Sequence, residues 1–263
     1  MENKVKSYWE ERASLNQNAV TGTTNDVYLR ELEIKTFCNT LKNLDVNMNS
    51  KILDVGCGDG YTTLNIAKSF PETKFEGVDY SENMIANAKV NVKNSDGAIS
   101  NVSFKVADAT KIQDSFPAET FDFILSDRCL INLENSQAQY EAVKQISQIL
   151  KPGGYYLAIE NFNEGQNNLN EARVKMGLSE IPVRWHNYFF NENEFVKNVS
   201  NWFTSTNFVE FSSAYYYATR VIYSSICKLQ GVEPDYMHDI HKVSVELPVI
   251  GKFSPIRLVI LKK

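Results

Sequence analysis

KILDVGCGDG (residues 51–60) decides the fold, because an apolar run here passes directly into a glycine-rich turn. Residues 51–56 have the apolar character of a buried parallel strand, and TTLNIAKSF (residues 62–70) has the pattern of a helix. Glycine lets the backbone turn sharply and approach a ligand closely. The spacing is GxGxG, and Tyr61 occupies the position of the third glycine in the dinucleotide pattern GxGxxG. We therefore expect a strand, a ligand-binding turn and a helix in succession.

Outward from this turn, strand-like and helix-like segments alternate. Further strands are predicted over residues 74–80, 101–110, 121–127 and 155–161, and further helices over 25–44, 81–93 and 137–151. Such alternation is typical of βαβ units and a parallel sheet. Two later strands, 207–215 and 255–263, flank a mostly helical piece over 216–246, and the last strand is buried only if it pairs with the sheet. The pattern predicts a doubly wound α/β fold.

The composition excludes several classes of protein. The chain has 263 residues, of which 43% are hydrophobic and 22% charged, so it is neither a disordered chain nor a coiled-coil rod. Its net charge of −5 does not favour binding to nucleic acid or to an anionic membrane. The four cysteines have no metal-ligand or disulfide spacing, and no apolar run suits a secretory signal or a membrane span. We expect a cytoplasmic protein without a metal.

Acidic residues around the glycine-rich turn indicate which ligand it binds. Asp54 and Asp59 flank the turn, where they would repel the pyrophosphate of a dinucleotide and suit a cationic amine. Asp79 ends the second predicted strand, where a carboxylate can accept both ribose hydroxyls. Asp108, in VADAT, is placed to meet an adenine amino group. A ligand with an amine, a ribose and an adenine but no phosphate is S-adenosylmethionine.

KILDVGCGDG, GVDYSENMI, VADAT and KPGGYY occur in this order over about residues 50–160. This series resembles the motifs of class I S-adenosylmethionine-dependent methyltransferases. The resemblance implies a Rossmann-like seven-stranded sheet, mostly parallel with an antiparallel last strand. It also implies cofactor contacts at Asp54, Gly56, Gly58, Asp79, Tyr80, Met84, Asp108 and Ala109. Ser126 occupies the place where the family's fourth strand passes under the cofactor, and the family often folds an N-terminal helix, here with Tyr8 and Arg12, over it.

We interpret the chain as a single domain over residues 1–263. It would comprise an N-terminal helical cap (1–48), a cofactor-binding core (50–160) and two helical lid insertions that bind substrate (161–205 and 216–250). The first insertion is rich in aromatic residues, as suits a lid that excludes water from a small substrate. A small satellite core under a long loop is the alternative.

The candidate catalytic residues are Arg128 and His186. Arg128 follows the fourth predicted strand and is placed to hold the cofactor carboxylate or an anionic substrate group. An ion pair with Asp127 or Glu134 is the alternative. His186 is the best candidate base because imidazole titrates near neutral pH, although a histidine among aromatic residues is often structural. The candidate substrate-binding residues are Asn132, Arg173, Trp185 and Asn187.

The run RWHNYFF (residues 184–190) resembles bacterial small-molecule methyltransferases, some of which modify surface-glycan precursors. We therefore expect methyl transfer to an oxygen of a sugar- or nucleotide-linked phosphate or phosphoramidate precursor of a capsule. The alternatives are an N-methyltransferase acting on a small metabolite or amino sugar, an RNA or protein methyltransferase, and a non-catalytic cofactor-binding protein. The partner would be a small molecule, not nucleic acid or a membrane, and a homodimer stays open.

Overall fold

A computed structural model describes residues 4–15, 20–95 and 99–263. Residues 1–3 and 16–19 of the predicted cap lie outside the described residues. The order of the strands in the single seven-stranded sheet is β3-β2-β1-β4-β5-β7-β6. The strands are β1 (Lys51–Val55), β2 (Lys74–Asp79), β3 (Val102–Val106), β4 (Phe121–Asp127), β5 (Leu150–Asn161), β6 (Ser205–Val209) and β7 (Ile256–Lys262). β7 runs antiparallel to both β5 and β6, whereas β1 to β5 pair in parallel. The predicted fold class is confirmed.

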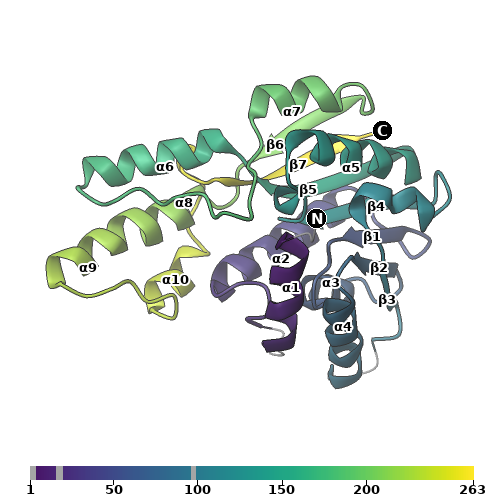
Figure 1. Cartoon of the computed structure of the whole chain (residues 1–263), viewed down its shortest axis with the longest axis horizontal. Helices are drawn as coiled ribbons and strands as arrows, with labels where there is room; N and C mark the ends of the chain where they lie inside the picture. The colour runs from purple at the N-terminus through teal and green to yellow at the C-terminus, as the bar shows by residue number, and fades with distance from the viewer. Residues whose placement is uncertain (1–3, 16–19, 96–98) are drawn as a thin grey trace.

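Helices cover both faces of this sheet (Figure 1). They are α1 (Lys4–Leu15), α2 (Val27–Asn43), α3 (Tyr61–Lys68), α4 (Glu82–Asn94), α5 (Ser136–Ile149), α6 (Asn163–Lys175), α7 (Glu192–Val199), α8 (Ser213–Tyr216), α9 (Ser224–Gln230) and α10 (Asp239–Ser244). Two short 3₁₀ turns, η1 (Ala109–Asp114) and η2 (Leu130–Asn132), and a π-helical segment, η3 (Tyr217–Tyr223), complete them. Together, α6, α9 and α10 form a lobe that projects beyond the sheet (Figure 1).

Side chains that alternate in direction along the strands form two hydrophobic cores, one on each face of the sheet. Leu53 and Ile124 belong to the core that contains Ile146 of α5. Their neighbours Ile52 and Leu125 belong to the core that α2 covers. These side chains are at most 1% exposed. Because successive strand residues point to opposite faces, a strand buried on both sides is largely apolar, as Ile52, Leu53 and Val55 of β1 are.

Two predicted strands end earlier in the structure than in the prediction. The strand predicted over 207–215 is β6 only as far as Val209, and α8 begins at Ser213. Tyr215 favours a strand by propensity but is helical here, because its hydroxyl donates to Asp26 in the cap of α2 and contacts His241. The strand predicted over 101–110 stops at Val106, and η1 follows it.

No helix within the described ranges is long and apolar enough to cross a bilayer. In the same ranges, no three His, Cys, Asp or Glu side chains gather where they could hold a metal ion.

Candidate active site

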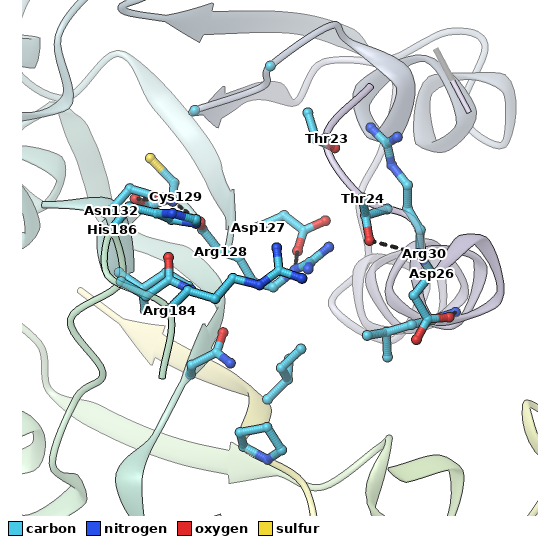
Figure 2. A pocket seen from close by; sticks show the side chains of 18 of the residues that line it. Thr23, Thr24, Asp26, Arg30, Asp127, Arg128, Cys129, Asn132, Arg184 and His186 are labelled. Carbon is cyan, nitrogen blue, oxygen red and sulfur yellow. Dashed lines mark hydrogen bonds and ion pairs between the residues drawn. The ribbon is translucent and has the colours of Figure 1, made fainter. Parts of the chain in front are cut away.

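A cavity of about 370 Å³ lies beyond the carboxyl ends of β1, β2 and β4. Its wall combines the glycine-rich turn with Trp9 of α1, Thr23 and Thr24 before α2, and His186 of the first insertion (Figure 2). Tyr216 closes it from the second insertion. Parallel sheets bind ligands at this edge, because the loops that leave neighbouring strands diverge there. The cap, the core and both insertions thus meet at one cavity.

Gly56 takes a conformation that only glycine adopts easily. Its φ is +76°, and a Cβ atom there would lie 2.2 Å from the Sγ atom of Cys129. The Gly56 amide donates to the carbonyl of Val78 on the neighbouring strand at 2.8 Å. Gly58 has a φ of +54°, and its amide donates to Asp79 Oδ2 at 3.0 Å. The turn is therefore held close to the end of β2, with its backbone facing the cavity.

Two buried carboxylates face the same cavity. Burial raises the pKa of Asp54 to about 7, although a hydrogen bond from Thr63 Oγ1 opposes the shift. Burial raises the pKa of Asp79 to about 6, against hydrogen bonds from the amides of Ser81 and Gly58. A cationic or hydroxyl-bearing ligand would stabilise the ionised form of either group. Asp59, the other acid of the turn, instead forms an ion pair with Arg30 at 3.2 Å.

Six of the predicted cofactor residues line the cavity: Asp54, Gly56, Gly58, Asp79, Tyr80 and Met84. Met84 is 2% exposed and so forms part of a packed apolar wall. Ser81 caps α4 by accepting a hydrogen bond from the Met84 amide, which fixes the start of this helix beside Asp79. These residues supply a glycine-rich turn, two carboxylates, an aromatic ring and a thioether. Such groups fit a ligand that carries an adenosyl group and an amine.

Three other predicted cofactor residues lie outside the cavity lining. Asp108 is exposed and caps η1, accepting hydrogen bonds from the amide and hydroxyl of Thr110. Ala109 follows it inside that turn and packs against the core. Ser126 is fully buried, and its hydroxyl donates to Glu160. Asp108 is absent from the cavity lining, and β3 ends at Val106 before the chain turns into η1.

Tyr8 and Arg12, the two cofactor contacts predicted on the N-terminal helix, also lie outside the cavity lining. Each contacts a segment that does line the cavity. Arg12 donates to the carbonyls of Gly22 and Thr21, which holds the loop that carries Thr23. The Tyr8 ring stacks on the His186 ring with 4.7 Å between centroids. Trp9, the next residue along α1, is the one that reaches the cavity.

Arg128 lines the cavity but already has a strong partner. Its guanidinium Nε lies 3.0 Å from Oε1 of Glu33, a fully buried residue of α2, and 3.6 Å from Oδ1 of Asp127. Burial works to lower the pKa of Arg128, but the two carboxylates outweigh it and raise the pKa. The guanidinium therefore stays charged. Arg128 also has a φ of +50°, which is unusual for a side-chain-bearing residue and typical of functional turns. Of the two partners anticipated from the sequence, Asp127 forms the ion pair with Arg128, and Glu134 is not among the ion-pair partners of Arg128 in the described residues.

His186 lies at the junction of the cap and the first insertion. It is 7% exposed, and Nδ1 finds no hydrogen-bond partner among the residues that the structure describes. Burial lowers the pKa of His186, and the positive charges of Arg184 and Arg12 lower it further, so the ring is neutral at pH 7. A neutral imidazole with a free nitrogen on a cavity wall can accept a proton.

Two of the four predicted substrate-binding residues line the cavity and two do not. Asn132 and Asn187 line the cavity. Asn132 is held by its neighbours, because it accepts from Trp9 Nε1 at 3.2 Å and donates to the carbonyl of Arg128. Trp185 is 65% exposed and contacts Tyr8 and His186 edge-on, outside the cavity lining. Arg173 also lies outside it and donates to the carbonyls of Ser179 and Arg220.

Several lining residues were not predicted from the sequence as site residues. They include Asp127, Arg184, Tyr216, Arg220 and Tyr236. Arg184 had a usable signal, since it stands two residues before His186 in the run RWHNYFF. Tyr216, Arg220 and Tyr236 of the second insertion had no such signal in the sequence, because their position depends on contacts with the cap.

A family model described as a methyltransferase domain matches residues 47–225 of the chain. The chain belongs to this methyltransferase family. The predicted membership of the class I S-adenosylmethionine-dependent methyltransferases is confirmed, and S-adenosylmethionine is the cofactor that this membership assigns to the cavity. The surface-glycan subtype stays a prediction.

Three curated relatives show the range of this similarity. An uncharacterized methyltransferase of Schizosaccharomyces pombe is 31% identical over 122 residues, which cover 45% of this chain and 42% of the relative. Phosphoethanolamine N-methyltransferase 3 of Arabidopsis thaliana is 35% identical over 114 residues, covering 43% and 21%. A malonyl-[acyl-carrier protein] O-methyltransferase of Halalkalibacterium halodurans is 29% identical over 173 residues, covering 64% and 60%. The chain spans about half the length of most of the curated relatives that it matches.

Solved methyltransferases share the fold over most of the chain. An S-adenosylmethionine-dependent methyltransferase from Methanosarcina mazei superposes with a TM-score of 0.55 and 17% identity, covering 85% of this chain and 96% of the other. A geranyl diphosphate methyltransferase in complex with GPP and sinefungin gives a TM-score of 0.55 and 12% identity, covering 88% and 75%.

Proposed function

We propose that this methyltransferase transfers a methyl group to an oxygen atom of a small acceptor that binds in the cavity. One observation carries this proposal: a single cavity brings Asp54 and Asp79 together with His186, a neutral imidazole with an unpaired nitrogen. The particular acceptor that we propose is a sugar- or nucleotide-linked phosphate or phosphoramidate precursor of a surface polysaccharide. Its support is the resemblance carried by residues 184–190.

The chemistry requires little from the protein besides alignment. S-adenosylmethionine supplies a sulfonium methyl group that is already activated, so neither a nucleophilic side chain nor a metal ion is obligatory. Holding two reactants in line can lower a barrier by roughly 7–11 kcal/mol. Asp79 and Asp54 would orient the cofactor, and His186 would take the proton from the acceptor hydroxyl. A positioned base contributes typically about 10²–10⁴-fold to the rate.

Aromatic side chains of the cap would help to keep water from the reacting groups. Tyr8 and Trp9 of α1 pack on His186, with 4.7 Å and 5.9 Å between ring centroids. The cap therefore closes over the insertion at the point where the proton moves. A dry site strengthens each electrostatic contact and prevents hydrolysis.

The preference for oxygen rests on His186, because the relatives are named for different acceptor atoms. One is an O-methyltransferase and another an N-methyltransferase. An amine acceptor must also lose a proton, but an ordinary hydroxyl is much less acidic than an ammonium group and depends more on a base. Transfer to nitrogen is the second candidate, and the Arabidopsis relative supports it.

The test is methyl transfer from labelled cofactor to a panel of sugar phosphates, phosphoramidates and matching amino compounds, followed by mass spectrometry. We expect O-methylation by the wild type. His186→Gln should lower kcat by roughly 10²–10⁴-fold without weakening the binding of S-adenosylhomocysteine. Tyr188→Phe, which removes an exposed hydroxyl from the same segment, is the matched control and should leave kcat unchanged. Methylation at nitrogen only, or no transfer to any member of the panel, would refute the proposal.

A further inference from the structure

Four arginines line the cavity, and three of them contact buried carboxyl groups. The pairs are Arg30 with Asp59, Arg128 with Glu33, and Arg220 with Asp26. Each of these arginines has a partner within the protein, so it is less available to a ligand. Buried charges are ordinarily paired in this way, because an unpaired one is costly.

Arg184 differs from these three arginines, because it is exposed at the edge of the cavity. Its guanidinium has no hydrogen bond or ion pair with any residue that the structure describes, and Figure 2 shows its side chain pointing into the cavity. Its backbone is nevertheless fixed. The carbonyl of Arg184 accepts from the Asn187 amide at 2.9 Å, and the amide of Tyr188 donates to the carbonyl of Ile131 in η2. A charged group is thus presented to the cavity from a held segment, two residues from His186.

We propose that Arg184 binds an anionic group of the acceptor, a phosphate or a carboxylate, and so selects acidic acceptors. The proposal rests on the proposed function and names the chemistry that the acceptor must carry. Guanidinium is planar and donates two parallel hydrogen bonds to such an oxyanion. With the anion held at Arg184, a hydroxyl elsewhere on the same molecule would be directed to His186.

The carboxylate of the cofactor is the competing ligand for this arginine. The residues that fit the cofactor come from the ends of β1 and β2 and from α4, whereas Arg184 comes from the first insertion beside the candidate base. This placement favours the acceptor. The two ligands can be separated, because 5′-methylthioadenosine has the adenosyl group of S-adenosylhomocysteine but no carboxylate.

The experiment uses the protein saturated with S-adenosylhomocysteine and inorganic phosphate as the probe. The ring protons of His186 are followed by NMR, and His186→Gln identifies their signal among the three histidines of the chain. The charged groups that act on His186 are Arg184 and Arg12, while Tyr8, Trp9 and Trp185 contact its ring. Bound phosphate would offset the charge of Arg184, so it should raise the pKa of His186.

Three variants distinguish the outcomes. Arg184→Gln should weaken phosphate binding roughly tenfold or more and abolish the phosphate-induced rise. Arg184→Lys should retain part of both effects. Lys197→Gln, which removes an exposed charge from the same insertion without touching the cavity, should behave like the wild type.

Either of two results would overturn the inference. One is a His186 titration that phosphate leaves unchanged in the wild type, or changes equally in Arg184→Gln. The other is an Arg184→Gln protein that loses affinity for S-adenosylhomocysteine but not for 5′-methylthioadenosine, since the arginine would then hold the cofactor carboxylate. Failure of the proposed function is distinct: the wild type would bind phosphate through Arg184 and still methylate no acceptor.

Discussion

Gly56→Ala tests the geometry of the glycine-rich turn quantitatively. An alanine at this φ of +76° costs about 1–2 kcal/mol from the left-handed conformation alone. The new Cβ would also lie 2.2 Å from the Sγ and 2.6 Å from the Cβ of Cys129, and overpacking of this kind costs typically about 1–3 kcal/mol. We therefore expect the free energy of unfolding to fall by about 2–5 kcal/mol in total. Urea unfolding measures it.

Gly153→Ala is the matched control. Gly153 has nearly the same φ, +77°, but nothing lies within 4 Å of the point that a Cβ atom would occupy there, so only the conformational cost of about 1–2 kcal/mol applies. Adding Cys129→Gly to Gly56→Ala should recover the overpacking part as a positive coupling in a double-mutant cycle. Equal destabilisation by the two alanine variants, with no coupling to Cys129, would refute the reasoning.

Three further predictions concern buried acids. Because burial raises the pKa of Asp54 to about 7 and an ammonium ligand needs its carboxylate, affinity for S-adenosylhomocysteine should fall roughly tenfold between pH 7.5 and 5.5; calorimetry showing no change would contradict this. Glu160→Gln replaces an acceptor of two amide hydrogen bonds, from Leu130 and Ile131, so unfolding free energy should drop by about 1–3 kcal/mol in urea, whereas an unchanged midpoint would count against the network. Asp26→Asn leaves the buried charge of Arg220 unpaired and should lower the free energy of unfolding by about 3–5 kcal/mol. A variant with the same thermal denaturation midpoint as the wild type would disprove this.

The cofactor half of the site could be predicted from the sequence because it is local. Asp54, Gly56 and Gly58 follow one strand, and Asp79 and Tyr80 end the next. Parallel strands place their carboxyl ends at one edge, so residues from two loops meet without any knowledge of distant contacts. Motif spacing and topology together were sufficient to predict that these residues line one cavity, and their contacts with the cofactor stay a prediction.

The contacts of Arg128 with Glu33 and of Tyr215 with Asp26 could not be predicted in the same way. Glu33 lies 95 residues before Arg128, and Asp26 lies 189 residues before Tyr215. Both contacts depend on how the cap packs against the sheet, which no local pattern specifies. Asp108 was expected at the end of the third strand, but β3 ends at Val106 and the chain turns into η1, so Asp108 is not part of the cavity lining.

Calorimetric titration of S-adenosylhomocysteine into the wild type, Asp79→Asn and Asp108→Asn tests the central claim most directly. The account predicts binding to the wild type and a loss of roughly 10- to 100-fold in Asp79→Asn, since the carboxylate faces the cavity and makes charge-assisted hydrogen bonds. Asp108→Asn should bind like the wild type because Asp108 lies outside the cavity. No binding to the wild type, or equal losses in the two variants, would contradict it.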